Sequence, residues 1–301
     1  MDPQPAQLAA LAAVADHGTF EAAARALQVT PSAVSQRIRA LETAVGQVVV
    51  RRTAPCRPTV AGERLLRLAR QVQLLYDEAR AELSGAGAGP QGRLPVAVNA
   101  DSLATWFRDV VAEIGGWPGV ALQLQVEDQA YSVDHLRRGE VLAAVTSDPV
   151  PVQGCSVEPL GVLRYRPAAA PGFAERWRVG RGHDWAAMPV VVFNDLDTLQ
   201  HDLLRGRGVD QSPPVVHRVP TSADFLAAVR SGLGWGVLPE PQLEPAVADG
   251  SLVPLAGRAR VDVPLHWQRW RLGSPLLDRL TAAVRAAART QLRPGRPAGA
   301  Q

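Results

Sequence analysis

Four hydrogen-bonding side chains follow one another at helical spacing in the stretch "TPSAVSQRIRALE", residues 30–42. They are Ser32, Ser35, Gln36 and Arg39. On a helix they lie on one side, with short side chains near the start and longer ones further along. Hydroxyl, amide and guanidinium groups hydrogen-bond the edges of base pairs, and short residues let the helix start approach the floor of the major groove. A face exposed only to solvent usually mixes acids with bases, and Glu42 is the one acid of this stretch. The pattern therefore favours the reading of double-stranded DNA.

Apolar residues on the other side of the same stretch predict what anchors it. They follow at steps of four, three and four residues and are Val34, Ile38, Leu41 and Val45. This spacing predicts a helix over Thr30–Val45. Thr30 suits the cap and Pro31 the first helical position, and both belong to the DNA-contacting set because the helix enters the groove by this end. The preceding "GTFEAAARALQV" predicts a helix over 19–29, and the break "QVT" indicates a helix-turn-helix.

The stretch "GQVVVRRTAPCRPT", residues 46–59, leads from the recognition helix to the next patterned segment. Its short β-branched run and its prolines predict a small hairpin or wing, with Arg51 and Arg52 at the tip, near phosphates or a minor groove. The charge agrees, since residues 25–70 contain nine arginines and two acids. Together with a further helix over 4–16, this region is suited to a polyanion.

A long helix is predicted over Ala61–Leu83. Its apolar residues alternate at steps of three and four, which is the spacing of a coiled-coil seam. They are Leu65, Leu68, Val72, Leu75 and Ala79. Such a seam predicts at least a dimer, and its alternative is one face of a helix packed within its own chain.

Small residues and one proline in "SGAGAGPQG", residues 84–92, indicate a flexible linker. Beyond it, strands and helices alternate in two sets that begin at "RLPVAVNA" and "MPVVVFN". The first set includes a helix over residues 101–115, and a final helix starts at Ser274. This order predicts parallel sheets with right-handed crossovers in two α/β lobes with a cleft between them. The predicted domains are a DNA-binding domain (1–60), a linker helix (61–83), the flexible linker (84–92) and an effector domain (93–301) with lobe I at 93–160 and 266–301 and lobe II at 161–265.

Composition narrows the class of function. The chain has 301 residues, 47% of them apolar and 20% charged, and no apolar run long enough to span a membrane, so we expect a cytoplasmic protein without a membrane partner. Cys56 and Cys155 are expected to be reduced thiols. The motifs of serine hydrolases, zinc peptidases and nucleotide-binding loops are absent from the sequence, and its six histidines are scattered. We therefore predict no enzyme, no catalytic residue, no metal site and no cofactor.

Several of these stretches resemble one known family. "GTFEAAARALQVTPSAVSQRIRALE" and "RPTVAG" resemble the N-terminal domain of LysR-type transcriptional regulators, and the α/β region resembles that family's effector-binding domain. "VNADSLATWF", "LQVEDQ", "LRRGEVLAAVTS" and "VVVFNDLD" are similar to its ArgP/LysG branch, which controls export of lysine and arginine. The resemblance implies an N-terminal winged helix-turn-helix, a long linker helix and a two-lobed α/β effector domain like a periplasmic binding protein.

The chain departs from the family pattern in two places. Pro31-Ser32 stands where Gln-Pro is usual, so the base preference of the first helical turn does not carry over. Val48-Val49 stands where Leu-Phe is usual, and the smaller side chains could loosen the packing of the wing.

Effector-binding residues are expected beyond the carboxyl ends of the strands. Ser102 follows a strand and precedes a helix, where it acts as a helix cap or as a ligand contact. Comparable positions are held by Thr146, Asp195 and Thr221. If the ligand is lysine or arginine, as the resemblance implies, its carboxylate needs hydrogen-bond donors and its side-chain cation needs acids. The acids that we name are Glu127, Asp128 and Asp195, each of which could equally be a surface charge.

The sequence thus predicts a transcription regulator that activates an exporter gene in response to a small amino-acid effector. Its expected partners are promoter or operator DNA, further copies of itself in a homodimer or homotetramer, and RNA polymerase. One alternative is a regulator of the same family that senses a different metabolite. The other is a cytosolic small-molecule-binding protein with an accessory DNA-binding module.

Overall fold

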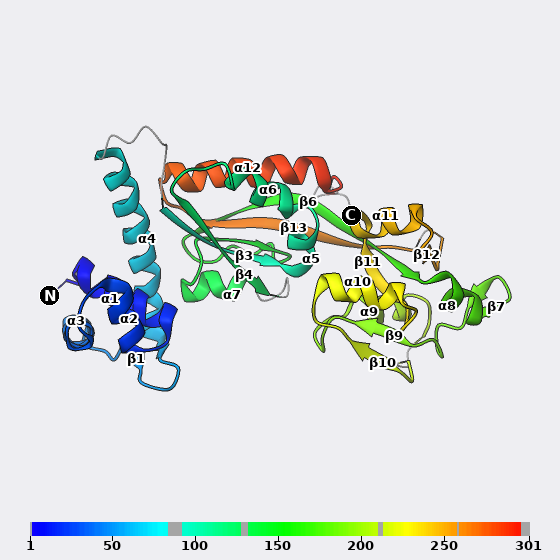
Figure 1. Ribbon diagram of the computed structural model, residues 1–301, viewed down its shortest axis with the longest axis horizontal. Coiled ribbons are helices and arrows are strands. Elements are labelled where there is room, and N and C mark those ends of the chain that lie inside the picture. Colours follow the sequence, from blue (N-terminus) through cyan, green and yellow to red (C-terminus); the bar gives the residue numbers. More distant parts are fainter. Residues whose placement is uncertain (1, 84–91, 128–131, 210–212, 258, 296–301) are drawn as a thin grey trace. The chain divides into compact units, whose positions relative to one another are not determined.

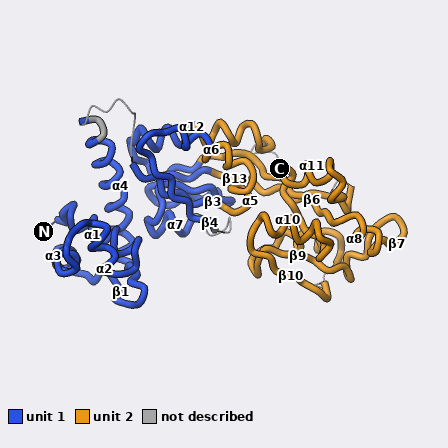
Figure 2. The backbone as a smooth tube through the Cα atoms, in the orientation of Figure 1, with its two compact units in different colours: residues 1–98, 112–157, 267–282 blue, residues 99–111, 158–266, 283–301 orange. Residues whose placement is uncertain are grey.

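The computed structural model consists of two compact units, coloured separately in Figure 2. Unit 1 comprises residues 1–98, 112–157 and 267–282, and unit 2 comprises residues 99–111, 158–266 and 283–301. The residues that the structure describes are 2–83, 92–127, 132–209, 213–257 and 259–295. Most of the predicted linker 84–92 therefore lies outside the described residues. None of the described helices is long and apolar enough to cross a membrane.

The N-terminal part of unit 1 is a winged helix-turn-helix followed by a long helix (Figure 1). Its elements are α1 (Pro5–His17), α2 (Phe20–Leu27), α3 (Pro31–Val45), β1 (Val50–Arg51), β2 (Arg57–Pro58) and α4 (Val60–Leu83). Helix α1 packs against α2, α3 and α4. The shared core buries Leu11, Ala23 and Ile38 completely. The predicted fold of this region is confirmed.

Local capping sets the turn between α2 and α3. Gln28 takes the left-handed conformation, with φ of 54°, and its N–H bonds back to carbonyls of α2, which ends that helix. Thr30 is extended, and its hydroxyl accepts the N–H of Ala33 at 3.2 Å, which starts α3. The two helices therefore change direction within three residues.

The wing is held to α3 and α4 at its base. Val49 is fully buried, and its N–H donates to Glu42 Oε1 at 3.1 Å. The Thr59 hydroxyl donates to the Val48 carbonyl at 2.7 Å. A Cβ on Gly62 would lie 2.0 Å from the Val49 carbonyl oxygen, so only glycine fits where α4 passes this strand. Val49 therefore anchors the wing, although it is smaller than the usual residue.

The α/β region is built on a mixed sheet with the strand order β11-β6-β13-β5-β3-β4, and β12 pairs with β6. In unit 1, β3 and β5 pair in parallel, as predicted. Strands β6 and β13 each begin in one unit and end in the other. The bounds are β3 (Gly92–Asn99), α5 (Ala100–Ala104), α6 (Phe107–Ile114), β4 (Val120–Glu127), α7 (Ser132–Arg138), β5 (Ala143–Thr146), β6 (Cys155–Ala169), β13 (Val261–Trp270) and α12 (Pro275–Gln291).

Unit 2 contains a parallel pair of strands, β9 and β10, and the antiparallel pairing of β11 with β6. Its core buries Phe225, Val229 and Leu238, and Gly236 lies so close to Phe225 that a Cβ would clash with the ring at 2.7 Å. The elements are α8 (Pro171–Arg176), β7 (Arg178–Val179), β8 (Gly182–His183), β9 (Val190–Val192), α9 (Leu199–Arg205), β10 (Val216–Arg218), α10 (Ser222–Arg230), β11 (Gly236–Pro239), α11 (Glu240–Ala248) and β12 (Val253–Pro254).

Two segments differ from the sequence-based expectation. The helix expected over residues 101–115 is divided into α5 and α6, because Thr105 leaves the helical conformation with ψ of −107°. The 15-residue strand β6 was not predicted. Alternation of more and less buried side chains is confined to residues 163–167, so residues 156–162 lack the pattern that marks a strand.

Candidate functional site

The outer face of α3 carries the predicted DNA-contacting side chains. Val34, Ile38 and Leu41 are fully buried and fix the helix from behind. On the opposite face, Ser35 is half-buried, and the exposed residues are Pro31, Ser32, Gln36 and Arg39. The structure therefore brings the predicted set onto one surface, available to a partner outside the chain.

Thr30 has a structural task as well as a position at the helix start. Its hydroxyl caps α3 and lies 2.9 Å from the hydroxyl of Ser32. This pair orders the first turn of the helix. Ser32 is exposed and can still present its hydroxyl outward.

The wing carries Arg51 and Arg52, and both are exposed. The guanidinium carbon of Arg52 lies 5.2 Å from the centre of the Phe20 ring at the start of α2, a cation–π arrangement. The Phe20 ring therefore orients the Arg52 side chain, while the charge of Arg52 stays accessible to a phosphate.

The predicted seam of α4 divides into two halves. Leu65 and Val72 pack against the core of the DNA-binding region. Leu68 and Leu75 face outward and are each 41% exposed, Ala79 is exposed, and Tyr76 beside them is 56% exposed. Part of the seam thus belongs to the chain's own core, and the rest is an apolar stripe on the surface.

Unit 2 contains a polar cluster centred on Asp101 of α5. The Tyr165 hydroxyl donates to Asp101 Oδ2 at 3.0 Å, and the Ser222 hydroxyl donates to Oδ1 at 2.7 Å. Gln242 Nε2 donates to the Ser222 oxygen at 3.0 Å. Four elements, α5, β6, α10 and α11, therefore fix the orientation of one carboxylate.

Some buried polar atoms of this cluster, and of residues close to it in the sequence, make no hydrogen bond within the described part of the chain. Within the described residues, no hydrogen bond is made by Asn99 Oδ1, by the fully buried Ser102 hydroxyl or by Gln242 Oε1. Leaving such a group unpaired costs about 1–3 kcal/mol, so buried polar groups of this kind are usually completed by a ligand or water. Acceptors at Asn99, Asp101 and Gln242 suit a cation, and the Ser102 hydroxyl suits a carboxylate.

The other predicted effector residues have different surroundings. In unit 2, Thr221 caps α10 and donates to Asp224 at 2.6 Å, next to the cluster residue Ser222. Asp195 is 77% exposed and pairs with Arg218 at 2.6 Å. Thr146, in unit 1, is buried and accepts the N–H of Asp148 at 3.0 Å. Glu127 ends β4, while its side chain and the whole of Asp128 lie outside the described residues.

Tyr165 and Gln242 belong to the cluster, and the sequence did not point to either residue. Tyr165 lies in the unpredicted strand β6, and Gln242 lies in α11, which follows one proline and contains two more. Asp101 and Ser222 are direct neighbours of the predicted Ser102 and Thr221. The position of a residue at the end of a strand or the start of a helix was therefore the informative signal. It led to residues that directly precede or follow, in the sequence, those that form the cluster.

Two family models match the chain. Residues 5–63 match the bacterial regulatory helix-turn-helix protein, LysR family, and residues 87–289 match the LysR substrate binding domain. The chain belongs to the LysR family. It is 50% identical to the lysine export transcriptional regulatory protein LysG of Corynebacterium efficiens over 96% of this chain and 99% of that protein.

Solved structures place the chain in the same branch. Full-length LysG from Corynebacterium glutamicum with bound effector Arg is 45% identical, with a TM-score of 0.79, over 97% of this chain and all of that one. ArgP from Mycobacterium tuberculosis is 46% identical, with a TM-score of 0.85, over 98% of this chain and all of that one. The two-lobed effector domain and the resemblance to the ArgP/LysG branch are thereby confirmed.

Proposed function

We propose that this protein is a sequence-specific transcription regulator that activates an exporter gene for basic amino acids when lysine or arginine binds. The proposal rests on two features that are both present in this member of the LysR family. Unit 1 presents the polar face of α3 to solvent, and unit 2 contains a preorganised carboxylate with unpaired polar atoms beside it. The first suits DNA and the second suits an amino acid.

The Asp101 cluster supports recognition of the effector. Its carboxylate is fixed by Tyr165 and Ser222 and can accept hydrogen bonds from an ammonium or guanidinium group, which are stronger than neutral ones. The Ser102 hydroxyl can donate to the carboxylate of the same ligand. Glu127 and Asp128 stay sequence-based predictions for the binding of a cation.

The apolar stripe of α4 supports self-association. Leu68, Leu75 and Tyr76 are exposed on a helix whose opposite side is already packed, and a second copy of α4 would cover them. A dimer would present two α3 helices to two half-sites of an operator. Effector binding would then act by changing the arrangement of the subunits on DNA and their contact with RNA polymerase. We place this activity in the cytoplasm, without a catalytic step or a cofactor.

A thermal-shift panel of the twenty amino acids, combined with operator binding at several salt concentrations, tests the proposal. We expect lysine and arginine to raise the melting temperature more than the other amino acids. We also expect operator affinity to fall with salt while remaining above the affinity for scrambled duplex. Stabilisation by an unrelated metabolite alone would indicate a different effector, and the absence of sequence preference at every salt concentration would reject the regulator.

A further inference from the structure

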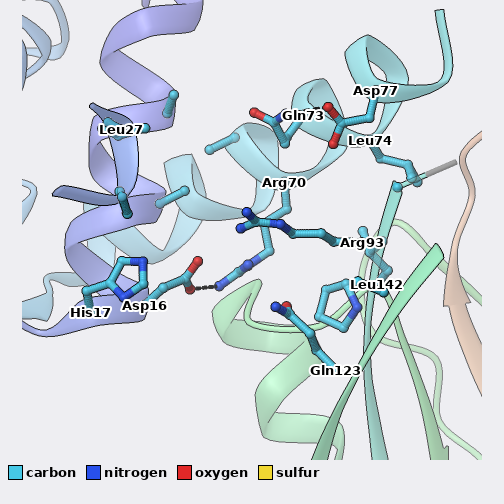
Figure 3. Close-up of a pocket in the computed structure, with 18 of the residues that line it drawn as sticks. Asp16, His17, Leu27, Arg70, Gln73, Leu74, Asp77, Arg93, Gln123 and Leu142 are labelled. Carbon is cyan, nitrogen blue, oxygen red and sulfur yellow. Dashed lines mark hydrogen bonds and ion pairs between the residues drawn. The ribbon is translucent and has the colours of Figure 1, made fainter. Parts of the chain in front are cut away.

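A pocket lies within unit 1 and contains no residue of the Asp101 cluster. Its volume is about 760 Å³. Its walls come from α1, α2 and α4 on one side and from β3, β4 and the residue before β5 on the other, and Figure 3 shows it in close-up. The DNA-binding helices and the effector-domain sheet thus share one cavity.

Apolar side chains form about half of the wall of this pocket, which leaves room for the aliphatic part of a ligand. The small and aliphatic side chains that line it include Ala12, Leu27, Leu74, Pro95, Ala121 and Leu142. Burial of the methylenes of a ligand against these side chains is favourable. The polar side chains of the pocket lie beside the apolar ones and can fix the orientation of a ligand.

Most charges of the pocket are already paired. Arg70 is held by Asp16 at 2.5 Å and donates to the carbonyl of Gly139 at 2.8 Å. Asp77 accepts from Gln73 and Arg80, both at 2.9 Å. These pairs account for both aspartates of the pocket.

Arg93 of β3 is the exception among the charged side chains. It lines the pocket and has no carboxylate within ion-pair distance in the described part of the chain. Figure 3 shows its side chain extending to the middle of the pocket, beside that of Arg70. Gln123, on β4, lines the same side and offers an amide donor. The pocket therefore has one cationic group in excess.

We propose that this pocket is a second ligand site, which takes a small aliphatic carboxylate. The carboxylate would accept hydrogen bonds from Arg93 and Gln123, because a guanidinium presents paired donors that match its two oxygens. The aliphatic body would lie along Ala12, Leu27 and Leu142. A bound molecule would contact both the DNA-binding helices and the sheet of unit 1.

Isothermal titration of the full-length protein with hexanoate tests this site. We expect saturable binding with one site per chain, weakened about tenfold or more in Arg93→Gln, since a charge-assisted hydrogen bond contributes about 1.5–3 kcal/mol. Arg271→Gln is the matched control, because Arg271 is an exposed arginine of unit 1 outside this pocket, and it should bind hexanoate like the wild type.

A second variant tests the apolar half of the site without changing a charge. Ala121 is exposed on β4 and lines the pocket, so Ala121→Phe should fill the space and weaken hexanoate binding while the fold persists. Equal binding of hexanoate by wild type, Arg93→Gln and Ala121→Phe would overturn the proposal. Binding of inorganic phosphate but not of hexanoate would also overturn it, because the site would then recognise charge alone.

Discussion

The outer face of α3 and the Asp101 cluster differ in how they are made and in what they can bind. Ser32, Gln36 and Arg39 come from one short stretch and are exposed, so their partner must be a surface that comes to them. The cluster collects side chains from four elements around a carboxylate whose hydrogen bonds are already formed. An exposed face suits a macromolecule, whereas a partly buried and preorganised cluster suits a small ligand.

The largest effect is expected from substitutions in the exposed apolar stripe of α4. The double substitution Leu68→Glu and Leu75→Glu should raise the dissociation constant of the dimer at least about a hundredfold, because each leucine contributes roughly 1.5–3 kcal/mol when buried. Analytical ultracentrifugation measures this directly. Leu233→Glu is the control, since Leu233 is 40% exposed in unit 2, and it should leave the dimer intact. A dimer that survives the double substitution would place the interface elsewhere.

The next effect tests whether the α3 face reads bases or only phosphates. Gln36→Ala should weaken binding to the operator about tenfold, because a good base contact contributes about 1–3 kcal/mol, and should hardly change binding to scrambled duplex. Arg64→Ala, at an exposed position near the start of α4, should weaken both duplexes alike. Fluorescence anisotropy with both duplexes distinguishes the two cases. Uniform weakening by Gln36→Ala would show that this side chain does not read sequence.

The hydrogen-bonded carboxylate of Asp101 should be less tolerant of substitution than an exposed acid. Asp101→Asn should weaken arginine binding about tenfold, because the charge of the acceptor is lost. Asp195→Asn should change it less than about twofold, since Asp195 is 77% exposed and already pairs with Arg218. Calorimetric titration with arginine provides the measurement. The reverse order would move the cation-binding acid to Asp195.

The smallest effect concerns a partly buried acid of unit 1 outside both sites. Burial favours a raised pKa for Glu140, but hydrogen bonds from His135 and Arg138 and their charges hold the pKa below its ordinary value. Ionised Glu140 therefore stabilises the fold above its ordinary pKa, and this stabilisation is lost as the pH falls through the lowered one. Glu140→Gln should reduce the melting temperature by about 2 °C at pH 7.

Melting curves of Glu140→Gln and wild type across the acid range complete that test. The difference between the two proteins should shrink as the pH falls from about 5 towards about 3, because wild-type Glu140 then becomes neutral as well. A difference that stays constant over this range would show that the substitution disturbs packing and that charge is not involved.

Local sequence was sufficient to specify the DNA-binding region. The stripe Val34, Ile38 and Leu41 and the cap Thr30 are local signals, because the helix period and the capping conformation depend on neighbouring residues. The same locality placed Ser32, Gln36 and Arg39 on one face. In the effector domain, local signals located the ends of strands, which led to Ser102 and Thr221.

Which polar groups meet depends on the tertiary structure. Asp101, Tyr165, Ser222 and Gln242 come from four different elements, and the alternation around Tyr165 indicates that its side chain is buried without indicating which group it meets. The division of the α4 seam is also a tertiary result, since Leu65 and Leu68 share one periodicity but only Leu65 packs against the chain's own core. Periodicity shows which side chains share a face, whereas the packing of distant segments determines what covers that face.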